Sequence, residues 1–275
     1  GLNSSHTKNK THKEVVNMAV QTVFKRYELK YLMTREQQKL LLKIMDGHMA
    51  LDKYGHTTIR NIYFDTDNYR LVRHSIEGPP YKEKLRIRSY SHVSGNDNVF
   101  VELKKKYKSV VYKRRLVLPL DETMEAFTMH RPLPTSSQIA DEINYFCSYY
   151  RTLRPAVFLS YEREAFYSTD GSDFRVTFDE NILYRDEDIS LSGEIYGTPI
   201  IEKNQVLMEI KTPGGIPMWM TDFLTGQRIY KTSFSKYGAA YKDMVLNNKC
   251  VYGFNHDTVL NSLLSPAYCT ANAVN

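Results

Sequence analysis

The sequence predicts an α+β protein, built as a closed antiparallel β-barrel of about eight strands that forms a basic tunnel, with helices packed on the outside. Three observations predict this fold. Short segments rich in β-branched and aromatic residues recur from residue 24 to residue 211, and charged and apolar residues alternate along them. Between them lie segments with helical spacing, whose apolar faces suit the covering of a sheet.

Each expected element has a local signal. Turn residues such as Ser94-Gly-Asn-Asp97 separate the strands, and Thr34 is a suitable N-cap for the first long helix. Strands are expected at 24–33, 59–66, 83–90, 99–106, 110–118, 155–167, 173–182 and 205–211. Helices are expected at 11–21, 35–49, 121–129 and 136–150 and in IPMWMTDFLTG and KYGAAYKDMVLNN, with a turn at IEGPPYK.

Composition limits the class of protein. The 275 residues are expected to form one domain at 23–250, between an N-terminal segment (1–22) and a C-terminal tail (251–275). The three cysteines show no CxxC spacing, which argues against a disulfide framework or a zinc site, and the histidines show no ligand spacing. No apolar run is long enough to span a bilayer and no signal segment is seen, so the expected location is cytoplasmic. The net charge of +6 favours an anionic partner.

Alternate residues of a strand share one face, and sorting the strands in this way gives one face dominated by Arg and Lys. For a single strand, the solvated side of a sheet is the simpler interpretation. For so many strands, the interior of a barrel is favoured. The charged face collects Arg26, Glu28, Lys30, Lys84, Arg86, Arg88, Glu102, Lys104, Lys106, Lys113, Arg115, Tyr161, Arg163, Arg175, Thr177, Asp179, Glu209 and Lys211.

Many cations in one interior cost several kcal/mol for each unpaired ion, unless an anion enters. A row of phosphates fits best, because Arg and Lys supply both charge and hydrogen-bond donors. The acidic residues Glu28, Glu102, Asp179 and Glu209 have the wrong sign for an anion. They could hold Mg²⁺ or Mn²⁺ bridging to phosphate oxygens, or each could pair with a neighbouring Lys or Arg, and both interpretations stay open.

The ordered set of strands resembles the VTC domain, the polyphosphate-polymerase domain of vacuolar transporter chaperone proteins, within the CYTH-like triphosphate tunnel metalloenzymes. The segments that carry the resemblance, over residues 24 to 240, are RYELKY, IRNIYFDTDN, KLRIRSY, FVELKKK, VYKRRL, RPAVFLSYEREAF, FRVTFDENI, LMEIK and FSKY. One departure is Ser233, where the family usually has Lys.

The resemblance implies site residues. The reaction is expected to depend on Arg86, Arg88, Lys104, Arg163 and Lys211. Further phosphate contacts are expected from Lys30, Lys84, Lys113, Tyr161, Ser235 and Lys236. The metal is expected at Glu209, the family's metal-binding acid, with Glu28, Glu102 and Asp179 as the other candidate ligands. The cofactor would be Mn²⁺ or Mg²⁺.

The resemblance implies a polyphosphate polymerase that transfers the γ-phosphoryl group of ATP to a growing polyphosphate chain. A tunnel triphosphatase is the first alternative, although such enzymes tend to present Glu-x-Glu-x-Lys where this chain has Arg26-Tyr-Glu28-Leu-Lys30. A polyphosphate or inositol-phosphate binding module without catalysis is the second. A separate membrane protein, at the inner face of a membrane, is a candidate partner. RNA is not expected, because the aromatic residues sit on the apolar faces and not among the basic residues.

Overall fold

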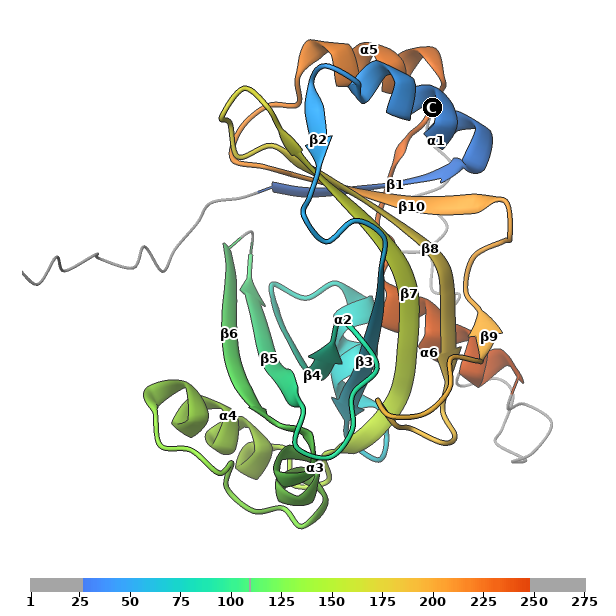
Figure 1. Cartoon of the computed structure of the whole chain (residues 1–275). Helices are drawn as coiled ribbons and strands as arrows, with labels where there is room; N and C mark the ends of the chain where they lie inside the picture. Colours follow the sequence, from blue (N-terminus) through green and yellow to red (C-terminus); the bar gives the residue numbers. More distant parts are fainter. Residues whose placement is uncertain (1–26, 109, 248–275) are drawn as a thin grey trace, which may run out of the picture.

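The computed structural model describes residues 27–108 and 110–247, which form one curled antiparallel sheet with six helices around and within it (Figure 1). The α+β class with a largely antiparallel sheet is therefore confirmed. The elements in chain order are β1 (Tyr27–Thr34), α1 (Arg35–Met45), β2 (Met49–Leu51), β3 (Thr57–Asp65), α2 (Arg70–Glu77), β4 (Tyr81–Ser89), β5 (Asn98–Tyr107), β6 (Val110–Pro119), α3 (Leu120–Thr128), α4 (Gln138–Tyr149), β7 (Arg154–Ser168), β8 (Arg175–Arg185), β9 (Thr198–Pro199), β10 (Gln205–Thr212), α5 (Met218–Gly226), β11 (Lys231–Thr232) and α6 (Lys236–Asn247).

The sheet curls without closing through its backbone. Its strand order is β11-β1-β10-β8-β7-β3-β4-β5-β6, with β2 on β7 and β9 on β8. Within the described residues no backbone pairing joins β11 to β6, so the closed barrel is corrected to a curled sheet (Figure 1). Side chains rather than backbone groups meet across the opening, where Lys104 on β5 donates to Glu28 on β1.

The predicted strands and helices within the described residues are present, with ends that differ by a few residues. The helix expected at 35–49 ends at Met45, because the short strand β2 begins at Met49. Four elements were not expected from the sequence: β2, α2, β9 and β11. The helix expected at 11–21 and the irregular tail after Gly253 lie outside the described residues.

Helix α2 escapes prediction because its capping group is remote in sequence. Its N-cap residue, Tyr69, has a left-handed backbone conformation (φ 57°) and no capping side chain. The free N–H groups at the start of the helix instead donate to Asp65, at the end of β3, from Leu71 (2.8 Å) and Val72 (2.9 Å). A local search for Ser, Thr or Asp at the N-cap position therefore finds no signal.

Two helix pairs cover the outer face of the sheet. Helices α3 and α4 pack on a core that includes Leu85, Val101 and Phe158, while α1 and α5 pack on one that includes Phe178 and Met208. These residues occupy the apolar positions of the alternating strands, so burial of this face follows from the sequence pattern. No helix in the described parts of the chain is long and apolar enough to cross a membrane.

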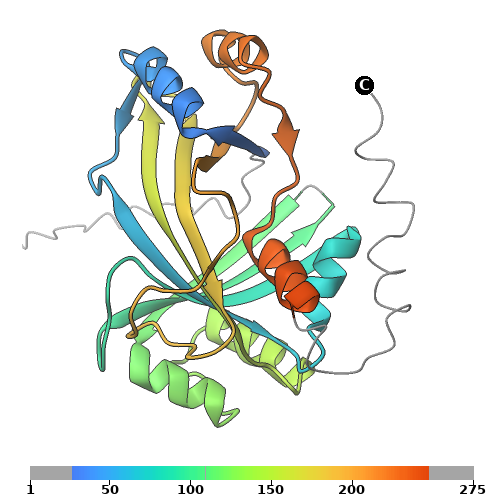
Figure 2. The ribbon, with the colours of Figure 1, turned by 90° about the vertical axis from the view of Figure 1, so that its right-hand side faces the viewer.

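The third helix pair lies against the inner face. Helices α2 and α6 are adjacent (Figure 2) and pack with the inner side chains Tyr63, Tyr161 and Leu207. The inner face is thus divided into an apolar part that α2 and α6 cover, and a charged part beside it. The start of α6 brings Ser235 and Lys236 to the boundary between the two.

Candidate functional site

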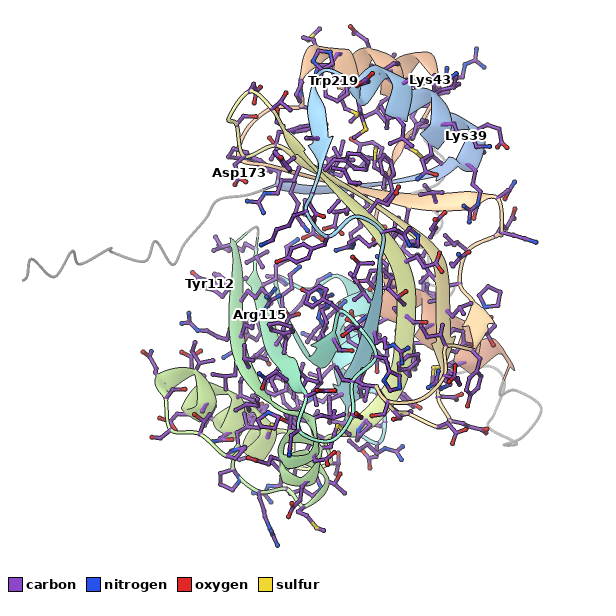
Figure 3. All side chains as sticks on the ribbon, viewed as in Figure 1. Lys39, Lys43, Tyr112, Arg115, Asp173 and Trp219 are labelled. Atoms are coloured by element: carbon purple, nitrogen blue, oxygen red, sulfur yellow. The ribbon has the colours of Figure 1, made fainter. Side chains whose placement is uncertain are left out.

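Three carboxylate centres organise the charged part of the inner face. The first is Glu102 on β5, which is 1% exposed. Arg86 on β4 and Arg115 on β6, the latter labelled in Figure 3, lie opposite it in the sheet. Its oxygens lie 2.7 Å from nitrogens of both Arg86 and Lys113 and 2.8 Å from Nε of Arg115. Burial alone would raise the pKa of Glu102, but the charges of Arg86, Arg88 and Lys113 outweigh it and hold the pKa well below its usual range.

The second centre is Asp179 on β8, which is fully buried. Arg163 on the neighbouring strand donates from Nε to Oδ1 (2.5 Å) and from Nη2 to Oδ2 (2.6 Å), a bidentate pair. Lys236, the first residue of α6, also donates to Oδ2. Burial raises the pKa of Asp179, while Arg163 and Lys236 lower it more, so the group is a carboxylate at neutral pH.

The third centre combines two carboxylates from paired strands. Glu209 on β10 is 2.8 Å from Nζ of Lys211, and Glu28 on β1 is 3.6 Å from Nζ of Lys30. The register of β1 and β10 brings Lys30 opposite Glu209 and Lys211 opposite Glu28. Each carboxylate is therefore flanked by lysines, and both have lowered pKa values, although burial of each and the charge of Glu209 on Glu28 act in the opposite direction.

A lysine group separates these centres. Lys84 on β4 is opposite Lys104 on β5, which is opposite Lys113 on β6, so three lysines form one row across the sheet. Burial and the charges of Lys30, Lys104 and Lys82 together lower the pKa of Lys84 to about 8, against a raising effect from Tyr63. Like charges directly opposite in a sheet are destabilising, so this row favours an anion between its members.

Arg88 is a buried cation held by neutral groups. Its Nε donates to Asn61 Oδ1 (2.9 Å), its Nη2 to the Tyr161 hydroxyl (3.1 Å) and its Nη1 to the Tyr90 hydroxyl (3.5 Å). Within the described residues, no carboxylate lies at salt-bridge distance from it. Because its charge is fixed in place and not paired, Arg88 is well suited to bind an anion.

Tyr63 joins this cationic cluster from β3. Its hydroxyl accepts a hydrogen bond from Nη1 of Arg86 at 2.9 Å. Burial raises its pKa, but Arg86, Arg88 and Lys84 lower the pKa more, to about 8. The positive charge around Tyr63 therefore outweighs burial and makes its phenol more acidic than usual.

The start of α6 completes the site. The Ser235 hydroxyl accepts hydrogen bonds from Nζ of Lys84 (3.1 Å) and from the Gly238 N–H (3.2 Å), while Nζ of Lys30 donates to the Phe234 carbonyl (2.9 Å). The segment before α6 therefore ties β1 to β4 across the interior.

The fifteen residues expected from the sequence lie in one connected region. They come from β1, β4, β5, β6, β7, β8, β10, the residue before α6 (Ser235) and α6, and the contacts above link them across the inner face. Lys84, Arg86 and Arg88 share the inner face of β4, as alternation predicts, and Lys104 and Glu28 meet across the opening. Two of the expected metal ligands, Glu102 and Asp179, have their oxygens engaged by cations.

Sequence reasoning missed other members of the site. Asn61 and Tyr63 lie on the inner face of β3. This is the one long strand whose alternate residues were not assigned to a charged and an apolar face. The alternation of residues placed Arg115 and Thr177 on the charged face, and both lie there. The family resemblance did not include them among the expected site residues. Tyr63 and Tyr90 also lie among the arginines, beside Tyr161, which was assigned to the charged face, so the expected separation of aromatic from basic residues is wrong for Tyr63 and Tyr90.

The residues at Glu209 fit a hard divalent cation. Glu209 and Glu28 offer carboxylate oxygens, and their charges interact. Thr177, opposite Glu209 in the sheet, has a buried hydroxyl for which the described residues provide no hydrogen-bond partner. Two carboxylates and an unpartnered hydroxyl form the oxygen-rich donor set that Mg²⁺ or Mn²⁺ prefers.

A second group with metal-ligand chemistry lies on the outer face. His56, Glu162 and Glu180 come from separate segments, so their sequence spacing gives no signal, and their ligand atoms lie within 4.8 Å of one another. Arg35 already pairs with Glu180, and Asn181 donates to Glu162 at 2.6 Å. The cations and donors present therefore account for these acids without an ion.

Fold and site together define a class of protein: an antiparallel sheet curled around an inner face on which basic side chains outnumber acidic ones, suited to binding a polyanion. The chain belongs to the VTC domain family, whose model matches residues 25–245.

The similarity of this chain to solved structures is weaker than its match to the family model. A candidate adenylate cyclase from Bacillus halodurans is similar at 17% identity with a TM-score of 0.49, covering 78% of this chain and 95% of that chain. A candidate adenylyl cyclase from Hippeastrum with a dominant triphosphatase activity is similar at 15% identity with a TM-score of 0.48, covering 78% and 95%. No curated protein matches the chain.

Proposed function

We propose that this protein is a metal-dependent polyphosphate polymerase, which transfers the γ-phosphoryl group of ATP to the end of a polyphosphate chain on its basic inner face. One observation carries the proposal: the row Lys84–Lys104–Lys113, beside the unpaired Arg88, gathers positive charge that the four carboxylates do not neutralise. A linear chain of phosphates supplies negative charge at each repeat, and so matches an extended row of cations.

Transfer of the γ-phosphoryl group depends mainly on the positioning of the reactants and on stabilisation of their negative charge. Arg86, Arg88 and Arg163 are fixed by hydrogen bonds before any ligand arrives, so they would bind the triphosphate with little reorganisation. Lys30, Lys84 and Lys104 would stabilise the charge that develops on the transferred group. The γ-phosphorus–oxygen bond to ADP breaks as a terminal phosphate oxygen of the acceptor bonds to that phosphorus, and ADP leaves with the electron pair.

Transfer to phosphate needs no general base, because a terminal phosphate is already ionised near neutral pH. Transfer to water is helped by a base that positions and deprotonates it. Glu102 and Asp179 are poor candidates for that role, since cations engage their oxygens and hold their pKa values low. This favours the polymerase over a triphosphatase.

Glu209, with Glu28 and the Thr177 hydroxyl, would hold the metal ion. When bound, Mn²⁺ or Mg²⁺ neutralises charge on phosphate oxygens and polarises them. The chain's own contribution is to keep Glu209 ionised, which Lys211 and Lys30 do by lowering its pKa against the effect of burial.

Product analysis tests the proposal. The purified protein is incubated with ATP and Mn²⁺, and the products are separated on a polyphosphate gel while free phosphate is measured in parallel. A polymerase gives a ladder of polyphosphate with ADP and little free phosphate. Free phosphate without a ladder would indicate a triphosphatase, and intact ATP with retained polyphosphate binding would indicate a binding module.

A further inference from the structure

Two successive lysine pairs face each other where β4 and β5 meet. Lys84 is opposite Lys104, and two residues further along the same strands Lys82 is opposite Lys106. Residues two apart in a strand share a face, so both pairs lie on the inner side. Pairs of like charge directly across a sheet destabilise it. Two in succession therefore need a compensating partner.

Carboxylates neutralise the positive charge of some of these rows along β4 and β5 but not of others. The Arg86–Glu102 pair is balanced, and Lys104 in the next row reaches Glu28 at 3.3 Å. In the outermost row, Lys82 donates to the Ser75 carbonyl of α2 at 2.9 Å. Within the described residues, neither Lys82 nor Lys106 has a carboxylate at salt-bridge distance.

We propose that Lys82 and Lys106 form an outer subsite for phosphate units that extend beyond the triphosphate held at Arg86 and Arg88. This inference rests on the proposed function and names its ligand as a polymer rather than a triphosphate. Each row adds about 6.6–6.8 Å along the strands, so the outer pair lies about two rows, or roughly 13 Å, from Arg86. A short triphosphate centred on Arg86 and Arg88 gains little from so distant a pair, whereas a longer chain passes over it.

The position of the pair agrees with this role. Lys106 is exposed, while Lys82 is half-buried beside α2, so the pair lies where the inner face opens to solvent. Burial lowers the pKa of Lys82, and the charge of Lys106 lowers it further through the repulsion between the two lysines. A phosphate between them would relieve it.

Calorimetry with two anions tests the subsite. Sodium tripolyphosphate and long-chain sodium polyphosphate are titrated into the full chain and into the double variant Lys82→Met, Lys106→Met. We expect long-chain affinity to fall about tenfold or more, while tripolyphosphate affinity stays within about twofold. Without any anion, thermal stability should be unchanged or higher, because the like-charge pair is gone.

The control is Lys105→Met, which removes one lysine charge from β5, next to Lys106 but on the outer face, where Lys105 approaches Glu83 at 4.0 Å. It should leave both affinities near wild type. Full long-chain affinity in the double variant, or an equal loss in the control, would overturn the subsite. Equal losses for both anions would make the pair part of the triphosphate site. If the wild-type protein binds neither anion, the proposed function itself fails.

Discussion

Lys104 on β5 donates to Glu28 on β1 at 3.3 Å, although these strands are not neighbours in the sheet. The contact crosses the opening that the backbone leaves between the two sides of the curl. Both side chains are partly exposed, at 41% and 33%, so the ion pair contributes little to stability. Its importance is its place, between the lysine row and the carboxylates at which we propose metal binding.

Replacement of Lys104 should separate binding from folding. Lys104→Met is expected to change the free energy of unfolding by less than about 1 kcal/mol, because a solvent-screened ion pair is weak. It should weaken tripolyphosphate binding about tenfold, because a charged donor is lost from the row. Denaturant titration and calorimetry on one protein preparation measure both. A large loss of stability with unchanged affinity would make Lys104 a structural residue.

Asp179 should behave in the opposite way. Asp179→Asn leaves Arg163 and Lys236 buried without their counter-ion and should lower the free energy of unfolding by about 3–5 kcal/mol. Because the folded state lowers the pKa of Asp179, its stabilising charge is present above the usual carboxyl pKa and is lost as the pH falls below it. The stability gap between wild type and variant should therefore narrow below pH about 4. Asp173→Asn, which affects the exposed pair with Arg175, is the control and should change stability by about 0.5 kcal/mol at most.

Affinity for tripolyphosphate should fall as the pH rises through about 8. Burial and neighbouring lysines lower the pKa of Lys84 to about 8, so its charge is lost there rather than near the usual value for lysine. In the free protein the same loss relieves repulsion, so the contribution of Lys84 to stability rises between pH about 8 and 10.5. Lys84→Arg keeps its charge and should retain affinity at pH 9.

Tyr63 titrates in the same range, since its pKa is also about 8, and its phenolate would add a negative charge beside Arg86. Tyr63→Phe removes that contribution alone. If neither variant flattens the pH profile, the lysine row is not where the anion binds.

Glu209→Gln tests the metal site while keeping the shape of the side chain. It should abolish Mn²⁺-dependent turnover and leave tripolyphosphate affinity in chelator unchanged or stronger, because a negative charge is removed from the anion site. Normal turnover would make Glu209 only the partner of Lys211, which lies 2.8 Å away. The metal would then have to be sought at Glu28 and Thr177.

The sequence predicted the strands and the face that their charges share, because alternation needs only local information. Arg86, Glu102 and Lys104 follow this rule directly. The alternation of charged and apolar residues along a strand does not show where a charged face ends. It therefore did not predict that α2 and α6 cover the part of the inner face at Tyr63 and Tyr161. That division depends on the long-range packing of α6.

Closure of the barrel and the pairing of the acids also depend on distant contacts. Glu102 and Asp179 were, with Glu28, the further candidate metal ligands beside Glu209. Only the register of three neighbouring strands shows that Glu102 is surrounded by cations, and only the path of the chain into α6 brings Lys236 to Asp179. The capping of α2 is also not local, because Asp65 accepts a hydrogen bond from the N–H of Leu71, six residues further along the chain.

Calorimetric titration of tripolyphosphate in chelator, with wild type and Arg88→Ala, tests most directly whether the inner face is the anion site. Arg88 is buried and held by Asn61, Tyr161 and Tyr90, so its removal deletes one fixed positive charge from the interior. The expected loss is about 1.5–3 kcal/mol, while Arg114→Ala, on the outer face of β6 where Arg114 pairs with Glu142, should bind as wild type does. Unchanged affinity in Arg88→Ala at both low and moderate salt would contradict the assignment of the inner face as the phosphate-binding site.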